Sequence, residues 1–246
     1  MSALGRSNVL VMVSDEMEAC VISCLVSGIG GHATMARTRE EVEQCVSESH
    51  WALIVTDAAS LHSEGTDSLP FRPIVDFDGS ILAIGGSAAV WDKVRALEAG
   101  ADAYIARPYE PAELVACTRA ALRRVRCRSE YAGGDRIQVA AVTLDVHSLS
   151  VTLPNDRHVR LSPSEMQVLR SLMLRSPAAI DRHELAEDLF GADVAPDAAG
   201  MVGVYINRLR RKIEPDVERP RHIVTVRGTG YRFDGEDGGV PLTVTM

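Results

Sequence analysis

Two neighbouring segments near the C-terminus carry the residues with the clearest chemistry. Residues 207–213 (Asn-Arg-Leu-Arg-Arg-Lys-Ile) are typical of the end of a basic helix. Residues 223–233 (Ile-Val-Thr-Val-Arg-Gly-Thr-Gly-Tyr-Arg-Phe) predict two strands joined by a tight, glycine-flanked turn. A basic helix fits the major groove of duplex DNA, and an arginine at a hairpin tip fits the minor groove. The two segments therefore predict binding to double-stranded DNA.

The charge of the chain is distributed in a way that agrees with this prediction. The whole chain has a formal net charge of −8. Between Asn207 and Arg232, however, eight Arg and Lys residues stand against Glu214, Asp216 and Glu218, a local net charge of +5. Phosphate binding requires a local basic surface and not a basic protein.

Length and composition restrict the class of protein. A chain of 246 residues with 46% apolar residues is a globular protein of one or two domains. No apolar run approaches the ~20 residues that span a bilayer, and the N-terminus lacks the apolar region of a signal peptide. We expect a cytoplasmic protein with no membrane partner.

The first half of the chain alternates between strand and helix patterns. Continuous apolar runs predict parallel strands covered on both faces, at residues 9–13, 52–56, 80–84 and 102–106. Helix patterns follow them, from 14 or 15 to about 27, after Thr38, up to Glu98, and from Pro111 to about Arg126. This order predicts a doubly wound α/β domain. Glycines and prolines between Asp57 and Ser80 predict a third helix that is short or displaced.

The second half has a different pattern. Short antiparallel strands are expected over 136–160, followed by a helix opened by a capping box at Ser162–Glu165, a helix capped by Asp181, a third helix at about 197–213, and the hairpin. These elements predict a winged helix-turn-helix. We place the first domain at 1–127, a linker at 128–136, the second domain at 137–234 and a flexible tail at 235–246.

With this order of elements, the chain resembles the winged-helix response regulators of the OmpR/PhoB type. The resemblance covers nearly all residues from Asn8 to Phe233. It is carried by Arg208–Lys212 and Thr225–Phe233, and in the first half by residues 97–102 (Leu-Glu-Ala-Gly-Ala-Asp) and 104–109 (Tyr-Ile-Ala-Arg-Pro-Tyr). It implies a flavodoxin/CheY-like receiver domain followed by the winged helix. It also implies a non-enzymatic transcription regulator that binds DNA as a homodimer, with RNA polymerase and a histidine kinase as further candidate partners.

The resemblance implies that Asp57, at the end of the third strand, is the phosphoacceptor. The surrounding pocket positions are Ser14, Asp15, Gly85, Tyr104 and Arg107. Ser14 replaces one of the two acids that hold Mg²⁺ in the family, Gly85 replaces a hydroxyl residue, and Arg107 replaces a lysine. Asp15 and Asp57 retain a divalent site that is one ligand short, so Mg²⁺ is a candidate cofactor and not a required one.

These replacements affect how the family transmits its signal. In the family, the hydroxyl moves toward the phosphate and the aromatic residue at the Tyr104 position turns inward. With Gly85 this coupling lacks its first link, so we expect a phosphorylation-independent dimer. Two alternatives remain open: a true phosphoacceptor that uses Asp57, and a receiver-like domain that senses a small ligand or a partner protein, suggested by the Pro/Gly-rich stretch 58–79.

The resemblance also implies a dimer surface, since receivers of this family pair through the fourth helix, fifth strand and fifth helix. Lys93 and Glu113 keep one charge pair of that surface, and Leu114 is expected on it. A second charge pair of the family is absent, because Ala103 and Cys117 stand at its two positions. Since both charges are replaced, neither is left buried without its partner. The alternative for Lys93 and Glu113 is two solvated surface charges.

A helical wheel separates two faces of the third helix in the second domain. Val202, Ile206, Leu209 and Ile213 share the core face. The outward face and its flanks, which enter the major groove in the family, carry Val204, Asn207, Arg208, Arg210 and Arg211. Of these, Val204 suits a thymine methyl group and Asn207 an adenine edge, while the arginines suit guanine or phosphate.

The hairpin supplies the remaining predicted contacts. Arg227 precedes the turn and is expected in the minor groove. Thr225, Thr229 and Tyr231 are candidates for phosphate contacts, with a core position under the wing as the alternative for Tyr231.

Overall fold

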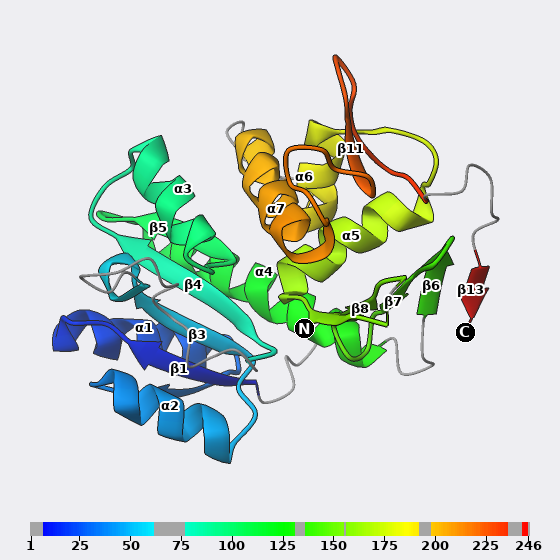
Figure 1. Ribbon diagram of the computed structural model, residues 1–246. Coiled ribbons are helices and arrows are strands. Elements are labelled where there is room, and N and C mark those ends of the chain that lie inside the picture. Colours follow the sequence, from blue (N-terminus) through cyan, green and yellow to red (C-terminus); the bar gives the residue numbers. More distant parts are fainter. Residues whose placement is uncertain are drawn as a thin grey trace. The chain divides into compact units, whose positions relative to one another are not determined.

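The computed structural model describes residues 7–61, 77–130, 136–154, 156–191, 198–235 and 243–245. The chain divides into two compact units, Met1–Val125 and Arg126–Met246 (Figure 1). Among the described residues, the first unit contains one sheet and the second contains two. No helix in the part of the chain described by the structure is long and apolar enough to cross a bilayer.

The first unit is built on a five-stranded parallel sheet in the order β2-β1-β3-β4-β5. Its strands are β1 (Asn8–Met12), β2 (His32–Met35), β3 (Leu53–Asp57), β4 (Ser80–Gly85) and β5 (Ala103–Ala106). Strands β3 and β4 are buried along their whole length, as their continuous apolar runs predict. Because the strands are parallel, their carboxyl ends lie along one edge of the sheet, where Asp57 ends β3 and Gly85 ends β4.

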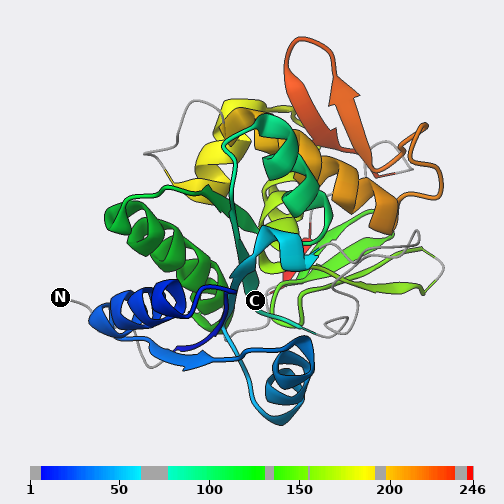
Figure 2. The ribbon, with the colours of Figure 1, turned by 90° about the vertical axis from the view of Figure 1, so that its left-hand side faces the viewer.

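Helices cover both faces of this sheet. They are α1 (Glu16–Gly28), α2 (Arg39–Glu48), the short 3₁₀ helix η1 (Ala58–Leu61), α3 (Val90–Glu98) and α4 (Pro111–Glu130). Helices α1 and α4 lie side by side on one face and share a core with β1, β3 and β4, while α2 packs on the other face through Val42 (Figure 2). Residues 62–76, which hold most of the stretch expected to contain a short or displaced helix, lie outside the described residues.

The second unit is a winged helix, as predicted. Its first sheet is antiparallel in the order β13-β6-β7-β8-β9, from strands β6 (Arg136–Val139), β7 (Val142–Asp145), β8 (Ser150–Thr152), β9 (His158–Arg160) and β13 (Thr243–Thr245). Three helices follow, α5 (Pro163–Leu174), α6 (Arg182–Phe190) and α7 (Ala198–Ile213). The wing is a three-stranded sheet in the order β10-β12-β11, from β10 (Ile180–Asp181), β11 (Ile223–Val226) and β12 (Gly230–Phe233).

The local signals in the sequence account for the helix ends. Asp15 caps α1 by accepting hydrogen bonds from the N–H groups of Met17 and Glu18. Ser162 and Glu165 form the predicted capping box at the start of α5, and Asp181 caps α6. The predicted core face of α7 is buried, with Val202, Ile206, Leu209 and Ile213 at most 1% exposed.

Two expected segment boundaries differ from the structure. Helix α4 continues to Glu130, into the predicted linker, because residues 127–130 contain no helix-breaking Gly or Pro. The tail was expected to be flexible over 235–246, yet β13 pairs antiparallel with β6, with Val244 opposite Ile137. The β-branched Thr-Val-Thr sequence suits the open edge of β6.

Leu114 was predicted at a dimer surface and is instead part of the core. Its side chain is 1% exposed and lies in the cluster formed by α1, α4 and the sheet. The helical periodicity of α4 places Leu114 on the same stripe as Ala121 and Leu122, both of which are buried. A change at Leu114 therefore tests folding and not assembly.

We predict that Leu114→Ala lowers the free energy of unfolding of the first unit by about 2–5 kcal/mol, the range for truncation of a buried leucine. Met17→Ala is the matched control, because Met17 is 76% exposed on α1 of the same unit, and it should change stability by less than about 0.5 kcal/mol. Urea unfolding followed by circular dichroism measures both. Equal effects of the two changes would contradict the core position of Leu114.

Candidate functional site

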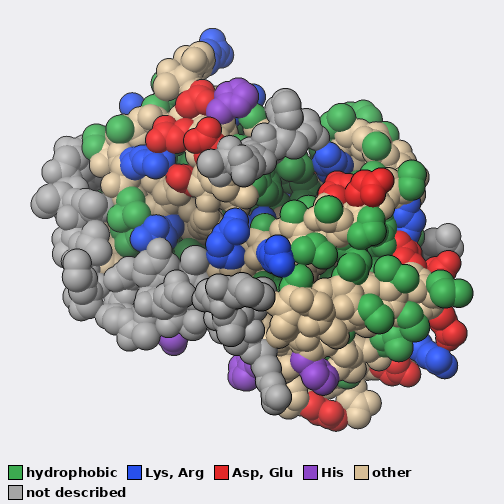
Figure 3. Space-filling model, turned by 180° about the vertical axis from the view of Figure 1, so that it is seen from behind, with side chains coloured by type: hydrophobic (Ala, Val, Ile, Leu, Met, Phe, Trp, Pro, Cys, Tyr) green, Lys and Arg blue, Asp and Glu red, His purple; other side chains and the backbone are tan. Residues whose placement is uncertain are grey.

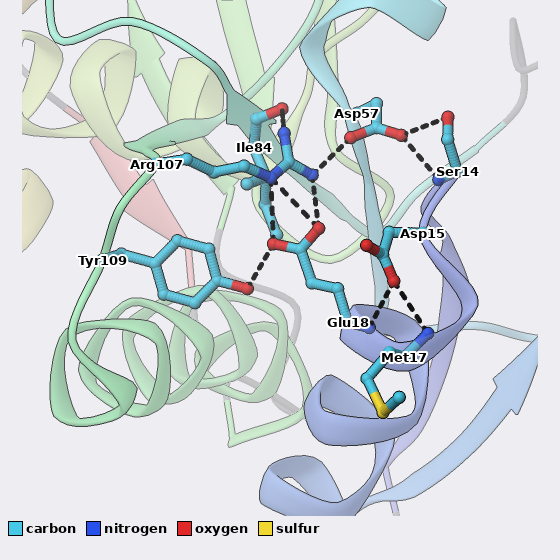
Figure 4. Close-up of polar contacts among 8 residues, drawn as sticks. All are labelled: Ser14, Asp15, Met17, Glu18, Asp57, Ile84, Arg107 and Tyr109. Carbon is cyan, nitrogen blue, oxygen red and sulfur yellow. Dashed lines mark hydrogen bonds and ion pairs between the residues drawn. The ribbon is translucent and has the colours of Figure 1, made fainter.

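Asp57, Ser14 and Arg107 meet at the carboxyl edge of the parallel sheet (Figure 4). Asp57 ends β3 and is 8% exposed. Its Oδ2 accepts hydrogen bonds from the backbone N–H and from the hydroxyl of Ser14, both at 2.7 Å. Its Oδ1 faces the Arg107 Nη2 at 2.5 Å. Both carboxylate oxygens of Asp57 are thus engaged by donors of the chain itself.

Arg107 is shared with a second acid. Its Nε and Nη2 donate to the carboxylate of Glu18 on α1, at 3.0 and 2.7 Å, and its Nη1 donates to the Ile84 carbonyl at 3.3 Å. The hydroxyl of Tyr109 donates to Glu18 Oε1 at 2.6 Å. The network Ser14–Asp57–Arg107–Glu18–Tyr109 therefore connects the end of β1, the end of β3, helix α1 and the segment after β5.

The electrostatics of this network favour the charged forms of Asp57 and Arg107 and the neutral form of Tyr109. Burial raises the pKa of Asp57, but hydrogen bonds from Ser14 and the Arg107 charge outweigh it, so this pKa lies below its ordinary value. The hydrogen bond to Glu18, and then that to Asp57, raise the pKa of Arg107 despite its desolvation. Burial, followed by the hydrogen bond to Glu18, raises the pKa of Tyr109.

The arrangement around Asp57 does not fit a divalent cation. Mg²⁺ requires oxygen ligands, whereas Asp57 is surrounded by an N–H group, a hydroxyl donor and a guanidinium. The carboxylate of Asp15 accepts from the backbone N–H groups of Met17 and Glu18 at 2.8 and 3.0 Å. Among the described residues, no three His, Cys, Asp or Glu side chains gather where a metal ion could bind.

Tyr104 occupies the space that a side chain at position 85 would need. A Cβ atom added to Gly85 would overlap the hydroxyl and ring of Tyr104. The Tyr104 hydroxyl donates to the Ser87 carbonyl at 2.6 Å, and burial of the ring raises the pKa of this hydroxyl. Gly85 thus lacks the hydroxyl group that the family has at this position. Because it has no side chain, it also leaves space for the ring of Tyr104 to lie inward.

The predicted dimer residues have different surroundings. Glu113 is exposed, Lys93 is half-buried, and Leu114 lies in the core. At the start of α3, on the helix that carries Lys93, Val90 is 73% exposed and Trp91 is 77% exposed. The exposure of these two large apolar side chains was not predicted from the sequence.

Helix α7 presents a smaller outward surface than the wheel suggested. Asn207 and Arg211 are exposed. Val204, predicted to face DNA, is only 7% exposed in the structure, which corrects that prediction. The helical wheel predicted a narrow core face on α7. Because Tyr205, beside Val204, is also completely buried, the buried face of the helix is wider than predicted.

Arg208 is held by a buried carboxylate. Its Nε lies 3.0 Å from Oε1 of Glu165, whose side chain is 0% exposed, and the Lys212 Nζ lies 2.6 Å from Oε2. Burial raises the pKa of Glu165, but Arg208 and Lys212 lower it more, so the group is ionised. The side chain of Arg208, 10% exposed, therefore fixes α7 against α5, in contrast to its predicted role in contacting DNA.

Arg210 connects α7 to the wing. Its guanidinium donates to the Ile223 carbonyl at 2.7 and 3.0 Å and to the Thr225 hydroxyl at 2.8 Å. It also lies 5.9 Å from the ring centre of Tyr231, and Arg182 lies 5.5 Å from the same ring. Tyr231 is 6% exposed, which favours the alternative of an aromatic residue packed under the wing.

The tip of the wing is open and basic. Arg227, Gly228 and Thr229 are exposed between β11 and β12, and Gly228 has a φ of 77°, which suits a glycine. A basic side chain stands at the tip of the projecting hairpin (Figure 3). Beside it, an open hollow of about 460 Å³ is lined by the hairpin and by Asp181 and Arg182.

Comparison with known proteins identifies the family of a chain that contains both units. Residues 156–233 match the family described as "Transcriptional regulatory protein, C terminal". The DNA-binding response regulator MtrA of Mycobacterium leprae is 30% identical over 229 residues, covering 92% of this chain and 98% of MtrA. Protein PetR of Rhodobacter capsulatus is 32% identical over 236 residues, covering 94% and 98%. The chain belongs to the OmpR/PhoB-type response regulators.

A solved structure supports the fold independently. A RitR mutant aligns with a TM-score of 0.75 at 19% sequence identity, covering 93% of this chain and 99% of that one. As a member of its family, this response regulator is a DNA-binding transcription factor and not an enzyme.

Sequence reasoning missed Glu18 and Tyr109 in the receiver of this response regulator. A guanidinium has five N–H donors, more than the single carboxylate of Asp57 can accept. Because an arginine stands where the family has a lysine, Arg107 needs a second acceptor beside Asp57. This need could have been predicted from the sequence. Glu18 lies 89 positions away from Arg107, so only the fold shows which acid fills that role.

We predict that Asp57→Asn lowers stability in a pH-dependent way. Because the pKa of Asp57 is lowered by folding, its ionised form stabilises the receiver above the unfolded pKa of about 3.9 and loses this effect as pH falls through the lower folded pKa. The variant should be less stable by about 1–3 kcal/mol at pH 7, with a difference that shrinks toward pH 3. Urea unfolding across this range, with Asp92→Asn as a control, measures it. A difference independent of pH would contradict the ion pair.

We predict that Arg227→Ala weakens DNA binding by about 1–3 kcal/mol, the scale of one good groove contact. Arg219→Ala is the control, because Arg219 is exposed on a different loop of the same unit. A gel-shift titration at fixed salt compares the three proteins. Unchanged affinity for Arg227→Ala, or an equal loss for Arg219→Ala, would show that the wing tip does not contact DNA specifically.

Proposed function

We propose that this DNA-binding response regulator acts as a dimer whose receiver requires no phosphorylation. The observation that carries the proposal is the pairing of Asp57 with Arg107 and Ser14. A phosphoryl group would have to displace one of these donors from a carboxylate that is only 8% exposed. In typical receivers the acceptor is balanced by a metal ion, whereas here a fixed guanidinium supplies the positive charge.

The position of Tyr104 supports the same proposal. In the family, an aromatic residue at this position turns inward when the neighbouring hydroxyl moves toward the phosphate. In this protein Tyr104 already lies against Gly85, with its hydroxyl bonded to the Ser87 carbonyl. We infer that the receiver is held in one signalling state by its own side chains.

Trp91 is the best candidate for an anchor of the dimer. Its side chain is 77% exposed beside Val90 on α3, the helix that also carries Lys93. Tryptophan is enriched among residues that contribute most to binding at protein interfaces. Dimerisation would raise the effective concentration of the second winged helix at a DNA site, which compensates for a recognition helix with few outward side chains.

The proposal predicts no phosphoryl adduct and a dimer without any phosphodonor. Incubation with acetyl phosphate and Mg²⁺, followed by intact-mass measurement, tests the first point. The triple variant Ser14→Asp, Gly85→Thr, Arg107→Lys restores the family pocket and should accept a phosphoryl group under the same conditions, which validates the assay. A stoichiometric adduct on the unmodified protein, absent in Asp57→Asn, would show instead that the protein is a phosphoacceptor.

Analytical ultracentrifugation at micromolar concentration tests the dimer. Trp91→Ala should shift the protein toward monomer and weaken binding to a two-site DNA. Met17→Ala is the matched control, because Met17 is an equally exposed apolar residue, at 76%, on α1. A wild-type monomer would overturn the constitutive dimer, and a dimer unaffected by Trp91→Ala would exclude this surface.

A further inference from the structure

Helix α1 carries two cysteines on the face that points away from the core. Cys20 and Cys24 are both free thiols and both exposed. The core face of α1 is formed by Ala19, Ile22 and Val26, which are at most 5% exposed. With about 3.6 residues per turn, the two cysteines lie roughly 40° apart on the opposite side of the helix. Cysteine is among the residue types most often fully buried, so core packing does not account for this pair.

A methionine extends the same sulfur-bearing face. Met17, near the start of α1, is 76% exposed (Figure 4). Its position falls with those of Cys20 and Cys24 in an arc of about 60° around the helix axis. The hydroxyls of Ser23 and Ser27 donate to carbonyl groups of the helix itself, at 2.8 and 2.9 Å. The exposed face of α1 therefore offers two thiols and one thioether.

The helical spacing of the two cysteines suits a bridging metal ion better than a disulfide. Residues four apart on a helix have Cβ atoms about 5–6 Å from each other. A disulfide requires about 3.5–4.5 Å between these atoms, so it would distort the helix. A metal ion between the two sulfurs replaces one S–S bond of about 2.05 Å with two metal–sulfur bonds, each about 2.3 Å in zinc thiolates. This longer connection spans the spacing of Cys20 and Cys24.

We propose that Met17, Cys20 and Cys24 bind one Cu(I) ion on the outer face of α1. Thiolate and thioether are the soft ligands that select Cu(I). A structural zinc ion takes four ligands, and among the described residues no three His, Cys, Asp or Glu side chains gather to supply them. On binding, each thiol loses its proton and the copper stays Cu(I), so no oxidant or reductant is consumed. The ion would lie on the helix whose Glu18 holds Arg107.

Anaerobic titration of the reduced full-length protein with Cu(I), in competition with the coloured chelator bicinchoninate, tests the site. We expect one tightly held Cu(I) ion per chain. Cys20→Ser and Cys24→Ser should each weaken binding by about tenfold or more, because each removes a soft ligand. Val21→Ala is the matched control on the same helix, since Val21 is 47% exposed and has no donor atom. Cys45→Ala, which removes a thiol of α2, should also leave binding unchanged.

X-ray absorption at the copper edge measures the donor set directly. We expect a first shell of sulfur atoms alone, with one sulfur fewer in Met17→Leu. Equal Cu(I) affinity of wild type and both serine variants, or an equal loss in Cys45→Ala, would overturn the proposal. Retention of Zn²⁺ in place of Cu(I) when both are supplied would also overturn it.

These outcomes are independent of assembly and of Asp57, because no phosphodonor is present and all substituted positions of α1 are exposed. Circular dichroism of each variant shows whether its fold is retained. No metal is added in the measurements of stability and assembly, so Met17→Ala remains a valid control there.

Discussion

The position of one guanidinium between two carboxylates organises the receiver of this response regulator. Arg107 contacts Asp57 on one side and Glu18 on the other, and so ties the ends of β3 and β5 to helix α1. Removing one partner from such a partly buried group would leave the other charge insufficiently compensated, which costs more than the pair contributes. The attachment of these three elements to one another therefore depends on Arg107 remaining in place.

The other replacements in the pocket are physically consistent with that pair. An acid at position 14 would repel Asp57 unless a metal ion lay between them, whereas Ser14 donates two hydrogen bonds to it. Any side chain at position 85 would displace Tyr104 from its inward position. Each change alone would disturb an ordinary receiver. Together they replace the acid, the hydroxyl and the lysine of the family pocket with an arrangement in which Ser14 and Arg107 of the same chain bond Asp57.

The sequence predicted elements well where the signal was local. Apolar runs located β1, β3, β4 and β5, whereas β2 (His-Ala-Thr-Met) lacks such a run and was not predicted. The capping residues Asp15, Ser162 and Asp181 located helix starts. Predictions failed where distant segments decide the environment of a residue. Leu114 and Val204 lie on faces that are buried by other elements, and a helical wheel shows the direction of a side chain without showing what covers it. Glu18 could not be chosen from several nearby acids, because its partner is remote in the sequence.

The winged helix illustrates how one residue can carry both a local and a non-local role. Glu165 was predicted as the second half of a capping box, and it does accept from the Ser162 N–H at 2.8 Å. Its carboxylate is also the buried anchor for Arg208 and Lys212 of α7. Because a buried carboxylate needs compensating cations, those two basic residues are committed to holding the helix. Of the residues on α7 and at the tip of the wing that were predicted to contact DNA, Asn207, Arg211 and Arg227 are exposed, so we expect affinity for DNA to depend strongly on the wing.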